Sequence, residues 1–165
     1  MKYIELTQNK KAMVDDEDFE WLNQFKWHVS GNGYATNTRY IRGSGRRNQK
    51  SVNTYMHRMI MANPQGKKID HIDGDGFNNQ KSNLRVCSNA ENSRNSSKSK
   101  SNTSGFKGVF LHDPKIRLAK PWRARLRFNR ENYHLGFYTT KEEAARAYNE
   151  GALKYFGKYA KLNEL

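Results

Sequence analysis

A polar, serine-rich run divides this sequence into two parts. Residues 93–105 read SRNSSKSKSNTSG and contain no apolar side chain for a core to accept, so we expect a linker there and not a helix or a strand. Hydrophobic residues make up only 35% of the 165 positions, which argues against one large core. The chain is therefore predicted to form two small domains, at residues 1–95 and 105–165, joined by a basic polar linker at 96–104.

Positive charge exceeds negative charge along the chain. There are 30 Lys and Arg residues against 16 Asp and Glu residues, so the formal net charge is +14 and the isoelectric point is near 9.9. The part after Ser96 carries 15 of the basic and 6 of the acidic residues. Such an excess predicts a polyanionic partner. We expect double-stranded DNA as the partner and no small-molecule substrate.

Hydropathy and cysteine content exclude several classes of protein. No apolar run is long enough to span a membrane, and residues 1–11 are too polar for a secretory signal. We therefore expect an intracellular protein that is neither secreted nor bound to a membrane. Cys87 is the only cysteine, which excludes an intrachain disulfide and a cysteine-rich zinc site. The oligomeric state stays open, with a monomer favoured.

Turn-forming residues between two short apolar segments predict a small β, β, α unit. Gly74 and Gly76 mark a turn after residues 69–72, and residues 84–87 can return as a second strand. A Ser-x-x-Glu capping box begins at Ser88, which predicts that the chain enters a helix there.

Four side chains of this unit have the chemistry for metal-assisted phosphodiester hydrolysis. Asp70 and Asn92 offer the oxygen ligands that a hard divalent cation prefers. The neutral imidazole of His71 can take a proton from an attacking water. Its second ring nitrogen needs an acceptor that fixes the tautomer, and the side-chain or backbone oxygen of Asn83 can serve.

This stretch resembles the core of the HNH endonucleases. In that family an Asp-His pair, here Asp70 and His71, is followed by Asn-Leu-Arg and Glu-Asn-x-x-Asn, which stand at 83–85 and 91–95. The resemblance implies that His71 is the general base and that Asn83 orients it. It further implies that Asp70 and Asn92 hold one divalent ion, Mg²⁺ with Mn²⁺ as a substitute. His71, Asn83 and Asn92 match the three positions for which the family is named. Asn92 stands at the last position in place of a His, and because a carboxamide is the weaker ligand, modest metal affinity is expected.

The front half of the sequence extends the resemblance to phage-type HNH endonucleases, which include homing enzymes. Residues 1–14 predict two brief strands, residues 15–25 an amphipathic helix, and residues 27–42 a hairpin, before a basic loop at 43–50. The resemblance places such an enzyme in the bacterial cytoplasm of a phage-infected host or in the host cell of a virus.

A second histidine, His57, lies in the apolar run 55–61. Two interpretations stay open for it. A histidine inside such a run is more often a hydrogen-bonded core residue, but His57 is also a candidate to approach the active site or a DNA phosphate.

The second domain contains a strand with one basic face. Arginines alternate with Trp122, Ala124 and Leu126 over residues 122–127, so a strand here buries the apolar set and exposes the basic one. A following strand repeats this pattern with Tyr133, Leu135 and Phe137 on the apolar side. A Thr-x-x-Glu capping box at Thr140 predicts a helix over residues 141–156, whose alanines allow close packing on the sheet.

This segment, residues 104–165, resembles the plant ethylene-response-factor DNA-binding domain of the Apetala type. The motifs are Phe-Lys-Gly-Val, Leu-Gly-Phe-Tyr, Glu-Glu-Ala-Ala-Arg-Ala-Tyr and the late Asn163. The resemblance implies a three-stranded antiparallel sheet that lies in the major groove. The implied DNA contacts are Lys107, Arg123, Arg125, Arg127, Asn132 and His134. Phe110 and His134 stand where that family usually has Arg and Trp, so its base preference is not transferred.

Together these features predict an α+β protein. An N-terminal ββα-metal (HNH) nuclease region, with its core at about 69–95, precedes a small three-stranded antiparallel sheet packed on one helix. The predicted function is that of a metal-dependent DNA endonuclease. Two alternatives are a non-catalytic DNA-binding regulator that retains an HNH fold and a zinc-stabilised nucleic-acid-binding module. The intact Asp70, His71, Asn83 and Asn92 set argues against the first, and the single cysteine argues against the second.

Overall fold

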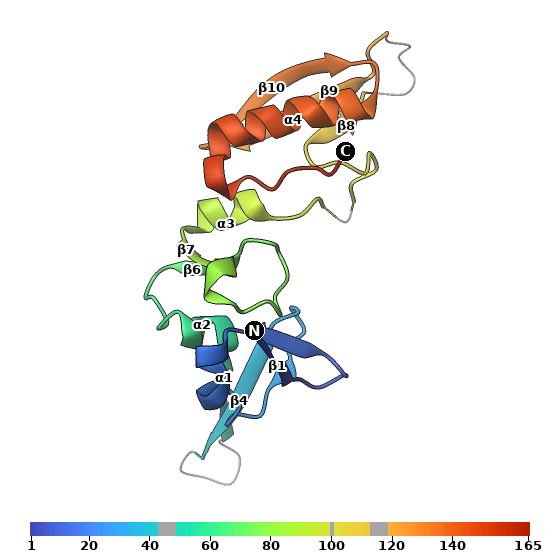
Figure 1. The fold of residues 1–165 in the computed structure, drawn as a ribbon. Helices are drawn as coiled ribbons and strands as arrows, with labels where there is room; N and C mark the ends of the chain where they lie inside the picture. Colours follow the sequence, from blue (N-terminus) through green and yellow to red (C-terminus); the bar gives the residue numbers. More distant parts are fainter. Residues whose placement is uncertain (43–48, 100, 113–118) are drawn as a thin grey trace. The chain divides into compact units, whose positions relative to one another are not determined.

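A computed structural model describes residues 1–42, 49–99, 101–112 and 119–165. It combines helices with small antiparallel sheets, as expected for an α+β protein (Figure 1). The chain divides into two compact units, Met1–Asn89 and Ala90–Leu165. The predicted basic loop at 43–50 falls almost wholly outside the described residues. Within the described residues, no helix is long and apolar enough to cross a membrane.

The first unit begins with a hairpin and a short helix. Strands β1 (Lys2–Glu5) and β2 (Lys11–Val14) pair antiparallel, as the sequence predicts. Helix α1 (Asp16–Leu22) stops before the predicted end at residue 25. The indole N–H of Trp27 donates to the Leu22 carbonyl at 2.8 Å, and the Phe25 amide donates to the same oxygen at 3.1 Å. These bonds turn the chain out of the helix because they occupy its terminal acceptor.

A meander follows, with strand order β3-β4-β5. The strands are β3 (His28–Val29), β4 (Ala35–Arg42) and β5 (Gln49–Tyr55), and the predicted hairpin between the first two is present. The chain then enters α2 (Met56–Ile60). One apolar cluster joins these elements to the first hairpin and α1, and its buried members are Ile4, Leu6, Ala12, Val14, Leu22, Trp27, Ala35 and Met56.

Strands β6 (Lys68–His71) and β7 (Leu84–Cys87) form the predicted antiparallel pair, with η1 (Lys81–Asn83) before β7. The long connection between them is tied to β2. The Met13 amide donates to the Phe77 carbonyl and the Asn79 amide donates to the Met13 carbonyl, both at 2.8 Å. The connection therefore extends the edge of β2 and is not a free loop.

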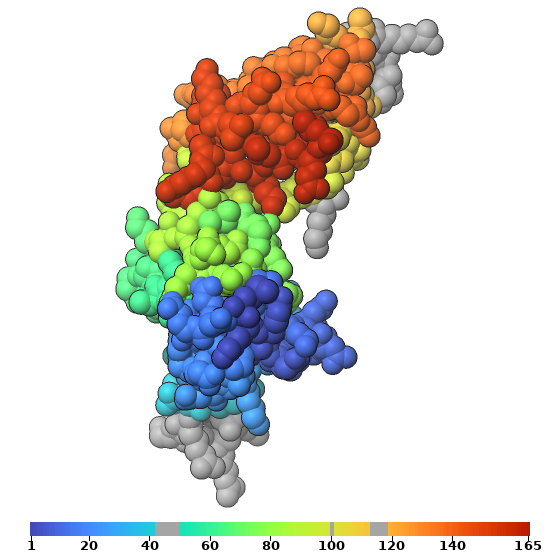
Figure 2. All heavy atoms as spheres, viewed as in Figure 1, coloured from blue at the N-terminus to red at the C-terminus, as the bar shows by residue number. Residues whose placement is uncertain are grey.

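The second unit carries α3 (Asn89–Asn95), three strands and a long helix. Strands β8 (Val109–Leu111), β9 (Trp122–Phe128) and β10 (Glu131–Tyr138) pair antiparallel in the order β10-β9-β8. Helix α4 (Lys141–Phe156) begins with the predicted Thr140–Glu143 capping box and lies along one face of this sheet (Figure 1), before η2 (Gly157–Tyr159). In Figure 2 the red atoms of residues 141–165 cover the orange strands.

The strand register places the predicted basic residues on one face, with one correction. Arg125 lies opposite His134 and Arg127 lies opposite Asn132, and directly opposed residues share a face. Phe137 was predicted on the apolar face, but it lies opposite Arg123 and is 42% exposed. A register shift between His134 and Gly136 accounts for the difference, because one extra residue moves every later side chain to the other face.

The predicted linker at 96–104 lies within the second unit, and its described residues form a hydrogen-bonded loop. Lys98 Nζ donates to the Gly105 carbonyl at 2.7 Å, and the Asn102 side-chain amide donates to the Phe106 carbonyl at 2.8 Å. The Ser104 hydroxyl donates to the Val109 carbonyl at 2.8 Å. Polar side chains thus replace an apolar core here by bonding to the backbone.

Leu22→Ala should destabilise the first unit by roughly 2–5 kcal/mol, because it opens a cavity in the apolar cluster. Urea denaturation followed by tryptophan fluorescence measures the change in the free energy of unfolding. Ile41→Ala is a suitable control since the Ile41 side chain is exposed on β4, and its loss should be less than half as large. Equal losses would contradict the assignment of Leu22 to the core.

Candidate active site

His71 ends strand β6 and is 4% exposed. Its imidazole stacks on the ring of Tyr34, with ring centroids 5.6 Å apart and an interplanar angle of 29°. Its Nε2 lies 3.3 Å from Oδ1 of Asn79, which is 0% exposed. The tie of Asn79 to β2 therefore positions the partner of the His71 ring.

The Asn79 contact assigns the tautomer of His71. The side-chain amide of Asn79 donates from Nδ2 to the Phe77 carbonyl at 3.1 Å, which leaves Oδ1 directed at the imidazole. An amide oxygen only accepts hydrogen bonds, so Nε2 of His71 must carry the proton. Nδ1 is then the nitrogen with the basic lone pair in the neutral ring.

His57 lies in α2 and is buried beside His71. The two imidazole centroids are 5.1 Å apart in an edge-on arrangement, and Tyr34 and Tyr55 lie 5.2 and 5.5 Å from the His57 ring. Nδ1 of His57 is buried with no hydrogen-bond partner among the described residues. Both interpretations of His57 thus hold in part: it is a core residue, and it borders the site. The expected hydrogen bond is missing at Nδ1.

Burial dominates the electrostatics of both histidines. It lowers the pKa of His57 to about 3, with smaller contributions from His71 and Arg58. Burial also lowers the pKa of His71, although the Asn79 contact and the carboxylates of Asp73, Asp70 and Asp75 act in the opposite direction. Both rings are therefore neutral near pH 7, which is the state that a general base requires.

Asn83 organises the connection between β6 and β7. Its Nδ2 donates to Oδ1 of Asp73 and to the Asn78 carbonyl, both at 2.9 Å, and its Oδ1 accepts from the Asp73 amide at 3.1 Å. Its backbone carbonyl accepts from the Ile72 amide at 2.9 Å. The prediction that Asn83 orients His71 stays a prediction, and the structure also places Asn79 in contact with the Nε2 atom of that ring. Asn83 fixes the loop that carries Asn79.

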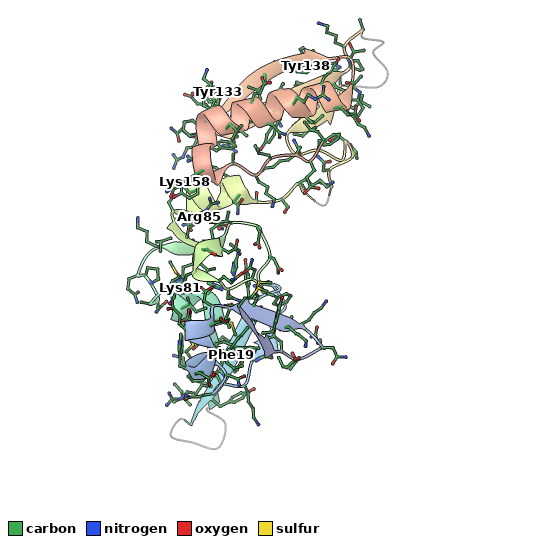
Figure 3. All side chains as sticks on the ribbon, in the orientation of Figure 1. Phe19, Lys81, Arg85, Tyr133, Tyr138 and Lys158 are labelled. Carbon is green, nitrogen blue, oxygen red and sulfur yellow. The ribbon has the colours of Figure 1, made fainter. Side chains whose placement is uncertain are left out.

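Asp70 is buried and paired with Arg85, its direct neighbour across the β6–β7 ladder. Nε and Nη2 of Arg85 donate to Oδ2 of Asp70 at 2.8 and 2.6 Å. Arg85 is labelled in Figure 3. The pair keeps a buried carboxylate compensated and holds its orientation at the end of β6.

The donor set suits a hard cation. Asp70 and Asn92 supply a carboxylate and a carboxamide oxygen, the ligand types that Mg²⁺ accepts beside phosphate and water. Among the described residues, no group of three or more His, Cys, Asp or Glu side chains could hold a metal ion. Asn92 lies in α3, within the second unit, and its joining with Asp70 stays a prediction.

The predicted DNA contacts divide into two groups. Five of them, on β9 and β10, share the outer face of the sheet by register: Arg123, Arg125, Arg127, Asn132 and His134. Phe110 lies on the same face, 4.8 Å from the Arg125 guanidinium. Lys107 differs, because its Nζ donates to the carbonyls of Arg94 and Ser96, both at 2.6 Å. Its ammonium is therefore engaged inside the unit.

The sequence analysis missed Asn79 and Arg85. Asn79 stood among turn-forming residues, and only its contact with β2 brings it to His71. Arg85 had a signal that was not used: once residues 69–72 and 84–87 are paired as a hairpin, the residue opposite Asp70 follows from the register.

Comparisons with known proteins find similarity to HNH endonucleases. A family model described as HNH endonuclease matches residues 55–94. The chain is 27% identical over 156 residues to an uncharacterized HNH endonuclease, L560, of Acanthamoeba polyphaga mimivirus. The aligned region covers 93% of this chain and 75% of that protein. The chain is also 52% identical over 46 residues to Protein 3.8 of Escherichia phage T7. This aligned region covers 28% of this chain and 38% of that protein. No solved structure matches significantly.

The chain thus carries an HNH endonuclease domain and has viral relatives, and the prediction of a nuclease enzyme is confirmed. The likeness of the second unit to the Apetala-type domain stays a prediction.

The buried His57 predicts how stability depends on pH. Its pKa is about 3 in the folded unit against an ordinary value of 6.5, so between these values the unfolded chain binds a proton that the folded chain excludes. The free energy of unfolding should therefore fall as the pH drops below 6.5. In His57→Phe this slope should decrease by up to about 1.4 kcal/mol per pH unit. Urea denaturation at pH 6.5, 6.0, 5.5 and 5.0 measures it, and an unchanged slope would contradict the neutral, buried ring.

Proposed function

We propose that this protein is a metal-dependent DNA endonuclease whose second unit binds the target duplex. The observation that carries the proposal is the buried, neutral His71 with its tautomer assigned, one residue after a carboxylate, inside the segment that matches HNH endonucleases. The viral relatives support a role inside an infected host cell.

In this proposal His71 acts as the general base. Its Nδ1 takes the proton of the attacking water, while Asn79 retains the Nε2 hydrogen bond and stabilises the imidazolium that results. Tyr34 limits rotation of the ring through stacking. Asn83 acts on His71 indirectly, because its hydrogen bonds to Asp73 and Asn78 hold the loop that carries Asn79.

Asp70 and Asn92 are the proposed metal ligands. A divalent cation, Mg²⁺ or Mn²⁺, would contact the scissile phosphate and stabilise the departing 3′ oxygen. Arg85 holds the Asp70 carboxylate in its orientation through its two hydrogen bonds. A carboxamide ligand binds less strongly than a carboxylate, so millimolar metal requirements are consistent with this set.

Targeting is assigned to the outer face of the second sheet. Arg123, Arg125 and Arg127 project from one strand beside Asn132 and His134, and guanidinium groups suit both phosphates and guanine edges. Charge complementarity with duplex DNA and the resemblance to the Apetala-type domain support this assignment. Lys107 is left out because its ammonium bonds to backbone carbonyls.

His71→Ala should abolish cleavage of supercoiled plasmid in Mg²⁺ and leave DNA binding in EDTA unchanged. The base acts only in the chemical step, and its loss typically costs ~10² to 10⁴ in rate. Single-turnover cleavage and fluorescence anisotropy measure the two effects. In the parent protein the rising limb of the pH–rate profile should lie below pH 6.5, because burial lowers the His71 pKa. If His71→Ala cleaved at nearly the parental rate, His71 would not be the general base.

Arg125→Ala with Arg127→Ala should weaken duplex binding and leave the metal site intact. If both arginines contact phosphates, the slope of log affinity against log salt should become shallower by roughly 1.8. If either reads guanine, the loss should depend on sequence and cost about 1–3 kcal/mol. A salt titration by anisotropy distinguishes these outcomes. Parental binding at every salt concentration would show that the arginine face is only a solvated surface.

The rival function is that of a non-catalytic DNA-binding regulator. It shares the arginine face but requires no metal or base. A parent protein that binds duplex DNA yet never nicks plasmid in Mg²⁺ or Mn²⁺ would favour the regulator.

A further inference from the structure

Helix α3 (Asn89–Asn95) is too short and too polar to be stable alone. Its sequence is NAENSRN, in which Asn and Ser are weak helix formers. Isolated helices shorter than about 12 residues are marginal in water, and tertiary contacts normally supply their stability. The structure supplies such contacts for α3 from within the second unit.

The first contact is at the end of the helix. Lys107 Nζ donates to the carbonyls of Arg94 and Ser96, both at 2.6 Å. The last carbonyls of a helix lack partners within it, and a lysine ammonium both bonds to them and complements the helix dipole. Burial, with a smaller contribution from Lys161, lowers the Lys107 pKa to about 8. Lys107 is half-buried, and its ammonium is engaged with the backbone at the end of α3.

Lys107 is itself held by the C-terminal segment. Its backbone amide donates to Oδ1 of Asn163 at 2.7 Å, and Nδ2 of Asn163 donates back to its carbonyl at 3.1 Å. Asn163 in turn exchanges two hydrogen bonds with the side chain of Asn149 on α4, at 2.7 and 2.9 Å. A continuous set of hydrogen bonds thus runs from α4 to the end of α3.

The second contact is aromatic. The guanidinium of Arg94 lies 4.8 Å from the ring of Phe128 on β9 and 5.7 Å from that of Phe156 on α4. Asn92 precedes Arg94 by two positions, about 200° around the helix. Asn92 therefore lies on a different face of α3 from the side chain that contacts these two rings.

We propose that Lys107 and Arg94 are positioning residues for Asn92, because they hold the end of the helix that carries it. The proposal rests on the proposed function of Asn92. Loss of either anchor should then impair cleavage of DNA that is already bound.

The experiment compares full-length Lys107→Met with a matched control, Lys98→Met. Lys98 also donates from Nζ to a carbonyl, but this carbonyl is that of Gly105, outside α3, and Lys98 is exposed. Amide hydrogen exchange is measured without metal or DNA. Exchange over residues 90–95 should become at least about tenfold faster in Lys107→Met and stay parental in Lys98→Met. Unchanged protection of β9 and β10 shows that the unit stays folded.

Binding and cleavage provide the second readout. Lys107→Met should bind duplex DNA in EDTA within about twofold of the parent and with the same salt slope. At saturating DNA it should cleave at least about tenfold more slowly and require more Mg²⁺. In an Asn92→Ala background the same substitution should have little further effect on cleavage, because residues that act through one group are not additive.

Arg94→Ala is the second variant, since it removes the aromatic contact without leaving carbonyls unpaired, and the same pattern is expected. Parental exchange of α3 in both variants would overturn the proposal. The proposal would also be overturned if Lys107→Met made the slope of log affinity against log salt shallower by about 0.9 and still cleaved fully at saturating DNA. Lys107 would then be a phosphate contact. A parent that fails to cleave overturns the proposed function itself, while the exchange measurement still decides whether α3 is anchored.

Discussion

The hydrogen bond between Asn79 and His71 is the interaction on which the candidate active site depends. A buried imidazole without a partner has no reason to keep one tautomer, and the wrong tautomer presents N–H where a lone pair is needed. Asn79 prevents this because its amide is fixed by the Phe77 carbonyl and its backbone by β2. The hairpin at the start of the chain, the Asp73 loop and Asn83 all serve to hold this one side chain in place.

Local patterns in the sequence predicted most of the first unit. The β6–β7 pair and the β3–β4 hairpin follow from turn residues between apolar segments. The role of His71 as the base, predicted from its place after Asp70, stays a prediction. Asn79 was missed because its position depends on the parallel bridge between Met13 and Asn78, two residues far apart in the sequence. Loop residues that act through long-range backbone contacts have no periodicity, so a sequence pattern does not reveal them.

The second unit shows the same limit in a different form. Alternation correctly grouped Arg123, Arg125 and Arg127, because strand β9 is regular. It failed for Phe137, because the shift at Gly136, where φ is +126°, breaks the period of two. The polar run at 96–104 looked like a tether since it has nothing apolar to bury, yet its serine, asparagine and lysine side chains bond to backbone carbonyls.

The ion pair of Asp70 with Arg85 has a consequence for folding. Metal sites built from several carboxylates repel themselves when empty, so folding and metal binding become one process. Here the buried carboxylate has its counter-charge from the same hairpin. The Asp70 carboxylate therefore gains its counter-charge as soon as the β6–β7 hairpin forms, whether or not a cation is bound.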